Sequence, residues 1–555
     1  MTLLKRLYGF PTWFFLVLIG ILVFIPFIGT VPLFDWDEIS TAESAREMLL
    51  THNFRTIQIN FQPFYEKPPL FIWLQALAMS YFGVNEFAAR FPNAILGIIT
   101  LLTVYNIGKR YFDAHFGIWW ALLFASSVLP QLYFKSSLID PLFNYLIFLS
   151  LYLLFIISIK DDFEPNKLRR KNHRRYLLLS AIAMGLAVLT RGPIALGLVV
   201  AIVSIVLLIN RGRLNFSLPD LILWSAIVII IIAAWLTVQI RSLGLGFVDN
   251  FIDYQIQQFT HEEAGRGGAF YYHMIALLLG CFPASVLCLE AFRRNYADTL
   301  HQLSFKRWMI VLLVVALVLF SILKTKIMHY STLCYFPITF LAAYYIHHLR
   351  QHHWQWTWRQ YIPTFFLGIG FALLAGAAIW VGANNIQLPL FHQDRFGAEA
   401  LNAIVYWNQN EIWFAVAYSI AILIALYFLA NKHIVRGLGV LLMATCVFVN
   451  VLSVVIVPRV EKYSQAAMLD FIESKKLEDC YIEVQGFKSY ATLFYSQKKP
   501  PLKKEDTDIN YIFHGTHHKA VYIISRINQL YTIEQPEMYE ELYRKNGYVF
   551  LKRCQ

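Results

Sequence analysis

Long runs of apolar residues recur along the whole chain and set its class. The sequence is 58% hydrophobic and only 15% charged, whereas soluble proteins carry about 25% charged residues. Each run has roughly 17 to 23 residues, enough for a helix to cross a ~30 Å hydrocarbon core. We therefore predict a polytopic α-helical membrane protein with about 13 transmembrane helices. The expected spans are 12–32, 86–108, 117–133, 139–158, 176–190, 193–210, 220–240, 270–290, 308–323, 331–347, 362–382, 411–430 and 436–457.

The basic residues between these spans predict the orientation of the chain. Loops rich in Lys and Arg stay in the cytoplasm, and placing the amino terminus there puts Lys109, the cluster 160–175 and Arg293 on that side. No cleavable signal peptide is expected, because the first run lacks a small-residue cleavage site. The net charge of +12 is explained by these loops and by anionic lipid headgroups, so a nucleic-acid partner is not needed.

The composition changes after Pro458. Residues 459–555 contain short alternating stretches, such as 480–484 and 520–524, separated by segments with a helical pattern. Such alternation is typical of a small α/β domain, and it follows a span that ends on the outer face. We predict a transmembrane domain over 1–458, with outer loops 33–85 and 242–268, and an outer α/β domain over 459–555.

Carboxylates gather directly after the first span. Asp35, Asp37 and Glu38 lie within four residues of one another, and acids beside a bilayer are costly unless a site uses them. Residues 40–43 have capping-box spacing, which predicts a short helix from Ser40 to about residue 50. The plain alternative is that Asp37 only caps this helix and favours its dipole.

Further charged residues fall at other outer span ends. Glu66 and Lys67 begin an apolar stretch over 69–82 that is too short to span and is expected to be a re-entrant or interfacial helix. Asp140 begins a span, and Arg191 occupies a tight turn between two spans. An ion pair, an N-cap and a snorkelling arginine are the respective alternatives.

One more outer segment, 324–330, combines two lysines with His329 and Tyr330. These side chains suit an anionic lipid headgroup and also suit a simple interface anchor. The six cysteines show no CxxC pair, no metal-binding spacing such as HExxH occurs, and no Gly-rich nucleotide loop is present. No metal ligand is therefore predicted, although a divalent cation is left open as a cofactor.

The order of these motifs resembles the superfamily of aminoarabinose transferases (ArnT) and protein O-mannosyltransferases. The shared motifs are Asp37-Glu38, the stretch 43–48, Tyr65-Glu66-Lys67-Pro68, 189–193 and Lys326-Ile327-Met328-His329-Tyr330. The resemblance implies a GT-C membrane fold and a polyprenyl-phosphate sugar donor, and the aminoarabinose transferases that modify lipid A look closest. Ser40 and Thr41 replace an arginine and a tyrosine of those enzymes, and 255–259 departs from their His-x-Gln-Arg-Phe stretch. The sugar is therefore undetermined, and the acceptor is lipid A or a glycoprotein.

The resemblance also implies roles for the outer-face residues. The donor phosphate leaves, so cations must stabilise its charge. If the acceptor is a hydroxyl it needs a general base, whereas with a phosphate acceptor the acids would orient groups; direct displacement predicts inversion. The loop 251–268 is expected either to close over the donor or to be a plain linker. The expected donor-phosphate residues are Lys67, Lys326, Arg191, Arg266 and Tyr330; the catalytic acids are Asp37 first, then Asp140, with Glu38; and the substrate contacts are Tyr65, Glu66 and His329.

Three functions fit the sequence. The first is an inverting glycosyltransferase of the bacterial inner membrane whose active site faces the periplasm and whose acceptor is lipid A, with a protein acceptor as its variant. The second is a lipid or solute transporter, which would need ionisable residues near mid-bilayer and broken helices there. The third is a non-catalytic membrane scaffold. Charges confined to one face favour the enzyme.

Overall fold

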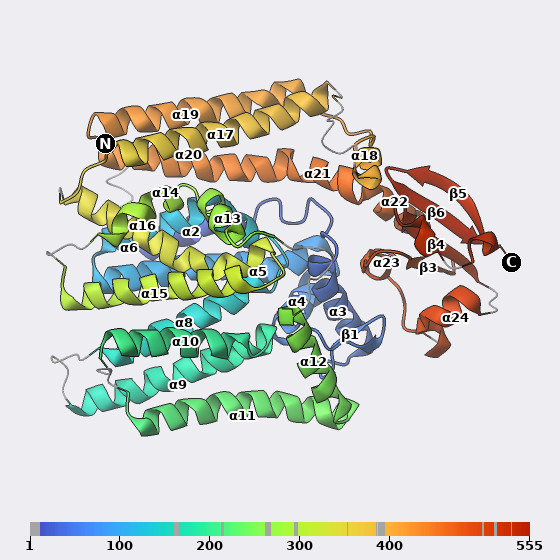
Figure 1. Cartoon of the computed structure of the whole chain (residues 1–555), viewed down its shortest axis with the longest axis horizontal. Coiled ribbons are helices and arrows are strands. Elements are labelled where there is room, and N and C mark those ends of the chain that lie inside the picture. The colour runs from blue at the N-terminus through green and yellow to red at the C-terminus, as the bar shows by residue number, and fades with distance from the viewer. Residues whose placement is uncertain are drawn as a thin grey trace.

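A bundle of long helices carries a small mixed sheet at one end (Figure 1). The computed structural model describes residues 11–159, 166–211, 216–260, 268–293, 298–351, 353–384, 386, 394–501, 504–515, 519–533 and 535–554. The bundle contains α2 (Thr12–Phe24), α5 (Glu86–Tyr111), α6 (Ala114–Ser126), α7 (Val128–Tyr133), α8 (Asp140–Ser158), α9 (Asn166–Arg191), α10 (Ile194–Ile209), α11 (Leu218–Leu243), α13 (Tyr272–Gly280), α14 (Ala284–Cys288), α15 (Leu300–Ile322), α16 (Tyr335–Arg350), α17 (Trp358–Ala383), α19 (Ile412–Ala430) and α20 (Ile434–Val455).

The predicted class of polytopic helical membrane protein is confirmed, but the count of 13 spans is not. Within the described ranges, seven helices are long and apolar enough to cross a membrane, or up to eight if α13 and the segment Ala284–Phe292, bent by 110°, form one span. The helices α2, α6 and α10 overlap predicted spans but have 13, 13 and 16 residues. They are shorter than the ~20 residues that a complete crossing needs.

Helix α16 shows why apolar character alone does not identify a membrane-facing helix. Every residue of α16 from Tyr335 to Leu349 is buried among other helices. In α11, by contrast, only 17% of the most apolar window is buried, so its apolar surface is available to lipid. Both sequences read as apolar runs, because a protein core and a bilayer select the same side chains.

Short elements cover the end of the bundle that carries the sheet. They are α3 (Asp37–Thr51), the hairpin strands β1 (Gln58–Ile59) and β2 (Gln62–Pro63), α4 (Leu70–Phe82) and α12 (Gly246–Thr260). The 13-residue α4 matches the short helix predicted over 69–82. Helix α3 begins at Asp37 rather than Ser40, so the predicted capping box is wrong. The Ser40 hydroxyl instead donates to the Asp37 carbonyl at 3.1 Å and accepts from Lys67 at 2.8 Å.

The chain after α20 builds the sheet. Helices α21 (Val457–Ser464) and α22 (Ala466–Ser474) lead into strands ordered β3-β4-β6-β5, of which β3 and β4 are parallel and the other pairs antiparallel. The strands are β3 (Cys480–Val484), β4 (Ala520–Arg526), β5 (Tyr539–Lys545) and β6 (Tyr548–Arg553), with short helices α23 (Ala491–Phe494) and α24 (Ile509–His514) between β3 and β4. This arrangement confirms a small C-terminal α/β region, while the boundary at 458 stays a prediction.

One apolar core joins the sheet region to the end of the bundle. Phe471 of α22 and Phe550 of β6 belong to the same buried cluster as Ile39 of α3 and Ile72 of α4. The C-terminal region is therefore packed against α4 and against α3, which begins in the acidic cluster. Contacts of this kind fix its position relative to any site formed there.

Candidate active site

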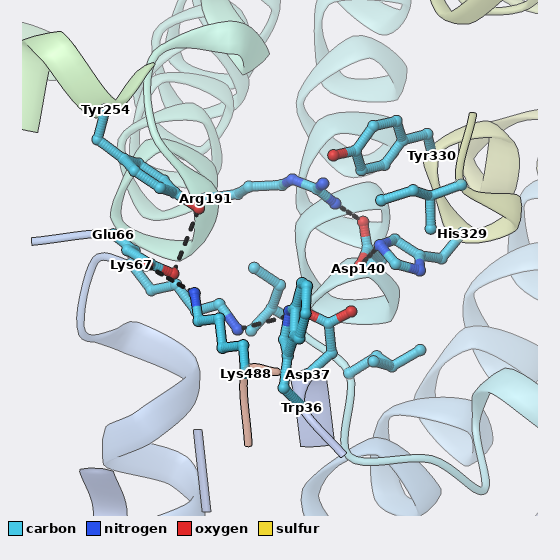
Figure 2. Close-up of a pocket in the computed structure, with 13 residues that line it drawn as sticks. Trp36, Asp37, Glu66, Lys67, Asp140, Arg191, Tyr254, His329, Tyr330 and Lys488 are labelled. Carbon is cyan, nitrogen blue, oxygen red and sulfur yellow. Dashed lines mark hydrogen bonds and ion pairs between the residues drawn. The ribbon is translucent and has the colours of Figure 1, made fainter. Parts of the chain in front are cut away.

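A pocket of about 650 Å³ lies where α3, α8, α9, α12 and the C-terminal region meet. Its lining is mainly polar, and Figure 2 shows the charged side chains pointing toward one another across it. The lining residues are Trp36, Asp37, Glu66, Lys67, Leu138, Ile139, Asp140, Arg191, Tyr254, Ile327, His329, Tyr330 and Lys488.

Lys67 and Asp37 form the first of three ion pairs in this pocket. The Lys67 ammonium lies 3.7 Å from an Asp37 carboxylate oxygen and donates to the Ser40 hydroxyl at 2.8 Å. Asp37 is available at the pocket wall because α3 starts there, with Trp36 as its N-cap residue. Lys67 lies in the loop before α4.

Arg191 and Asp140 form the second pair. The Arg191 guanidinium contacts one Asp140 oxygen directly, and His329 Nε2 lies 3.9 Å from the other. The guanidinium also covers the Tyr330 ring, 4.6 Å from its centroid. Asp140 is at the first position of α8 and Arg191 at the last of α9, so adjacent helix ends supply the pair. Each charge also suits its end of the helix dipole.

Lys488 and Glu66 form the third pair. The Lys488 ammonium lies 3.1 Å from Glu66 Oε1, and the Tyr254 hydroxyl donates to Glu66 Oε2 at 3.3 Å. The same ammonium lies 5.1 Å from the centroid of the Trp36 ring and 5.5 Å from that of Tyr490. The pair thus joins the C-terminal region to α12 and to the loop that contains Glu66.

The three cations influence one another. Burial lowers the pKa of Lys67, Asp37 and Glu66 oppose this effect, and the nearby Arg191 and Lys488 charges lower the pKa further. An anion bound beside Lys67 would favour the protonated amine again. The pocket is therefore arranged to gain from binding negative charge.

Two apolar cavities adjoin the polar pocket on different sides. One includes Phe143, Ile194 and Phe320 and shares Arg191 and Tyr330 with the pocket. The other has a volume of about 1430 Å³ and shares Asp37 and His329 with it. Its apolar lining includes Phe27, Ile28, Val31, Leu452 and Val460. The charged groups thus lie between two cavities suited to lipid chains.

The structure brings together most of the predicted site residues. Those in the pocket are Asp37, Glu66, Lys67, Asp140, Arg191, His329 and Tyr330. Tyr65 lies beside it instead, against the Phe247 ring at 5.6 Å between centroids. Residues 251–260 of the expected lid belong to α12, whereas Arg266 and the rest of 261–267 lie outside the described residues.

Two predicted residues have other contacts. Glu38 is buried against Arg90, with 2.7 Å between their charged atoms, and accepts from the Ser137 amide at 2.6 Å; it lines only the larger apolar cavity. Lys326 donates to the carbonyl oxygens of Ser321 and Leu323, both at 2.6 Å, and is not part of the pocket. The polar atoms of both side chains are therefore already satisfied by the protein.

Six pocket residues were not predicted, of which three have polar or aromatic side chains: Trp36, Tyr254 and Lys488. Trp36 lies inside the acidic cluster, so its position could have suggested a role. Tyr254 lies in the loop 251–268 that was expected to close over the donor, but it was not singled out there. Lys488 gave no signal, because it follows neither a span nor a recognisable motif. Among the residues that the structure describes, no three His, Cys, Asp or Glu side chains come close enough together to hold a metal ion.

Known proteins share this fold and parts of this sequence. A family model described as dolichyl-phosphate-mannose-protein mannosyltransferase matches residues 66–237. The chain is 25% identical over 426 residues to an undecaprenyl phosphate-alpha-4-amino-4-deoxy-L-arabinose arabinosyl transferase of Edwardsiella ictaluri, covering 74% of each chain. The crystal structure of ArnT from Cupriavidus metallidurans in the apo state superposes with a TM-score of 0.74 at 17% identity, covering 97% of each chain. The resemblance to the superfamily of aminoarabinose transferases and protein O-mannosyltransferases that the sequence motifs indicated is thus confirmed.

Two further comparisons agree with this resemblance. A relative of the same name from Wigglesworthia glossinidia brevipalpis is 25% identical over 309 residues, 55% of this chain and 53% of the relative, so about half of that protein's length is matched. The Cupriavidus metallidurans ArnT structure bound to undecaprenyl phosphate superposes with a TM-score of 0.72 over 97% of each chain, at 17% identity. The GT-C fold implied by the sequence motifs is thus confirmed.

Proposed function

We propose that this protein is an inverting glycosyltransferase that moves a sugar from a polyprenyl phosphate to a phosphate group of lipid A. The observation that carries the proposal is a polar pocket with three cations and three carboxylates, placed between two apolar cavities. A transferase with two lipid-linked substrates needs this arrangement, because both reacting headgroups must meet while their chains stay in apolar surroundings. Relatives named as transferases of undecaprenyl-phosphate-linked aminoarabinose support it.

The donor is assigned to the side of Arg191. Arg191 and Tyr330 line the smaller apolar cavity as well as the pocket, so a prenyl chain in that cavity would place its phosphate beside the guanidinium. Lys67 supplies a second cation. As the bond between the sugar and the phosphate opens, negative charge develops on the leaving phosphate, and these preorganised cations stabilise it.

The acceptor is assigned to the side of Asp37. Asp37 and His329 line both the pocket and the larger cavity, whose apolar lining suits a lipid chain. A phosphate monoester is largely ionised at neutral pH, so it attacks the anomeric carbon without a general base. The Asp37 carboxylate would then hold Lys67 in place and stabilise positive charge on the sugar ring in the transition state.

A protein acceptor is the second candidate, because the matching family model describes protein mannosyltransferases. The size and apolar lining of the cavity beside Asp37 favour a lipid. Mass spectrometry of lipid A and of periplasmic glycoproteins, from cells with and without the gene, separates the two. A mass increment of one sugar on lipid A, lost with the gene and regained on complementation, is expected; sugar found only on proteins would refute the lipid A assignment.

Transport of a lipid or solute is tested with the purified protein. We expect a glycosylated acceptor to form when the chain is mixed in detergent with a polyprenyl-phosphate sugar and lipid A. No compartments exist in detergent, so transport cannot produce this result. Uptake into vesicles with no glycosylated product in either assay would establish a transporter instead.

The cytoplasmic membrane of a bacterium, with the pocket facing the periplasm, is the location we propose. Reporter fusions after Arg170 and Arg294 should then be cytoplasmic, and fusions after Phe61 and Gln555 should be external, because basic loops remain inside. Alkaline phosphatase and green fluorescent protein fusions measure the two outcomes. A cytoplasmic carboxyl terminus would contradict the predicted orientation of the spans.

Lys67→Met is expected to raise the KM for the polyprenyl-phosphate donor by about 10- to 100-fold, the size expected for one charge-assisted hydrogen bond. Methionine retains the length and apolar stem of lysine but cannot donate to a phosphate. Initial rates at limiting donor and saturating acceptor measure the effect.

Lys326→Met is the matched control for that variant. Both lysines were predicted to bind the donor phosphate, but Lys326 donates to two backbone carbonyls outside the pocket. Its replacement should lower the melting temperature and leave the KM for the donor within about twofold, since only a group in the pocket contacts the phosphate. Equal KM effects of the two substitutions would show that the pocket does not define the phosphate site.

A further inference from the structure

Lys488 belongs to none of the sequence motifs, yet it lines the polar pocket together with Lys67 and Arg191. It lies in the C-terminal region, shortly after strand β3. Figure 2 shows its ammonium reaching the same space as Lys67. Lys67 and Arg191 together balance the negative charge of one donor monophosphate. The third cation, Lys488, therefore needs a different explanation.

The contacts of Lys488 place it on the acceptor side. Its ammonium lies 5.1 Å from the centroid of the Trp36 ring. The two neighbours of Trp36 in sequence, Asp35 and Asp37, both line the larger apolar cavity. Arg191, by contrast, lines the smaller cavity on the donor side. Lys488 is thus next to the entrance through which an acceptor headgroup would reach the sugar.

Hydrogen bonds fix the position of the segment that contains Lys488. The backbone amide of Tyr490 donates to the Asp35 carboxylate at 3.1 Å, and the Asp35 amide donates to Gln465 Oε1 at 3.3 Å. The first of these hydrogen bonds holds the segment of Lys488 against residues 35–37, and the second joins Asp35 to the start of α22. A lysine on such a fixed segment presents its charge at a defined place, as a binding group requires.

The pair of Lys488 and Glu66 can also exchange partners. The Lys488 side chain is 42% exposed and that of Glu66 24% exposed. An ion pair with this much access to solvent is weak, whereas a phosphate offers more acceptor oxygens and more negative charge to an ammonium than one carboxylate does. When a phosphate takes the place of Glu66 as the partner of Lys488, the exchange therefore favours binding of the phosphate.

We propose that Lys488 binds the phosphate monoester of the acceptor and selects a phosphate over a hydroxyl acceptor, an inference that rests on the proposed function. In the transfer, an oxygen of the acceptor phosphate forms a bond to the anomeric carbon. The bond from that carbon to the donor phosphate oxygen breaks, and its electron pair leaves with the polyprenyl phosphate. The two phosphates lie on opposite sides of the sugar, so each requires its own cation.

The test measures binding of three lipids to the full-length chain in detergent: lipid A with its phosphates, lipid A treated with phosphatase, and undecaprenyl phosphate. The wild-type chain should prefer phosphorylated over dephosphorylated lipid A by about 10-fold or more, as a charge-assisted hydrogen bond predicts. Lys488→Gln, which keeps a polar side chain but removes its charge, should reduce that preference to less than about twofold. Affinity for undecaprenyl phosphate should not change.

Two further variants make the result specific. Lys488→Arg should retain most of the preference, because guanidinium also binds phosphate. Lys545→Gln is the control: this lysine belongs to the same region but pairs with Asp470 on the surface at 2.9 Å, and its loss should change nothing. Equal weakening of both forms of lipid A, or equal weakening of undecaprenyl phosphate, would overturn the proposal and leave Lys488 a support for Glu66.

The same protein preparation separates this inference from the proposed function. Transfer of sugar from a polyprenyl phosphate to lipid A by the wild-type chain tests the function. If transfer occurs and Lys488→Gln keeps the full preference for phosphorylated lipid A, the inference fails alone. If the wild-type chain transfers nothing to lipid A, the function fails, and the binding measurement still decides whether Lys488 recognises a phosphate.

Discussion

Replacing Asp37 by asparagine should lower the rate of sugar transfer by about 10²- to 10³-fold, the loss typical of removing one preorganised electrostatic group. Asn has the shape of Asp, and the N-cap residue of α3 is Trp36 rather than Asp37, so the start of α3 should persist. It cannot carry the negative charge that lies 3.7 Å from Lys67 and faces both the pocket and the larger cavity. Single-turnover transfer at saturating donor and acceptor measures the chemical step.

Asp35→Asn is the matched comparison for this variant. Asp35 lies two residues away, and burial raises its pKa to about 6 even though hydrogen bonds from Ser489 and Tyr490 oppose this. Asparagine can still accept from the Tyr490 amide, and Asp35 does not line the polar pocket. We expect a change in transfer of less than about threefold, the scale of one weak neutral hydrogen bond. If both variants lost transfer equally, the acidic cluster would act through structure, and Asp37 would be only a helix-terminal residue.

Arg90→Met should destabilise the folded protein by roughly 3–5 kcal/mol, because it leaves a buried carboxylate without its partner. The Arg90 guanidinium donates to both oxygens of Glu38 and to the carbonyls of Ile28, Val31 and Pro32, at distances of 2.7 to 3.1 Å. It thus joins the end of the first helix to α3 and α5. Thermal denaturation in detergent, followed by loss of monodisperse protein, measures the effect.

The double variant Glu38→Gln/Arg90→Met checks the cause. Removing the charge of Glu38 as well should recover part of the lost stability, since the penalty comes from an uncompensated buried charge. Glu38→Gln alone should reduce stability less than Arg90→Met, and its rate of transfer per folded molecule should stay close to that of the wild type. A loss of transfer comparable to that of Asp37→Asn would instead restore the catalytic role that the sequence suggested for Glu38.

Most of the residues that could be predicted share one property: each is a charge at the end of an apolar segment. Asp37, Lys67, Asp140 and Arg191 were recognisable because a charge beside a bilayer needs a reason. Their convergence follows from the bundle, which brings helix ends together at one face. The superfamily resemblance added the expectation that this face carries a glycosyl transfer site.

Lys326 shows the limit of this reasoning. It has the same sequence signature as Lys67, a cation at the outer end of an apolar segment. However, α15 ends at Ile322, and the last carbonyls of a helix lack partners within it. The Lys326 ammonium donates to two carbonyls at this end, from Ser321 and Leu323. Sequence places a charge near a face, but only the fold decides whether a backbone oxygen or a ligand binds it.

Lys488 and the span count could not be predicted for a related reason. The contact between the Tyr490 amide and Asp35 joins positions 455 residues apart, which no local pattern encodes. Likewise, the apolar sequence of α16 is the same whether lipid or protein surrounds it, and here protein does. Long-range packing supplies the missing information in both cases.

The seam between residues 35–37 and 488–490 also has a consequence for the newly made protein. A chain is synthesised from its amino terminus, so Asp37 emerges early and Lys488 near the end. Until the C-terminal region has folded against α3, the pocket lacks one wall. A nascent or truncated chain can therefore have every long helix and still lack a complete pocket.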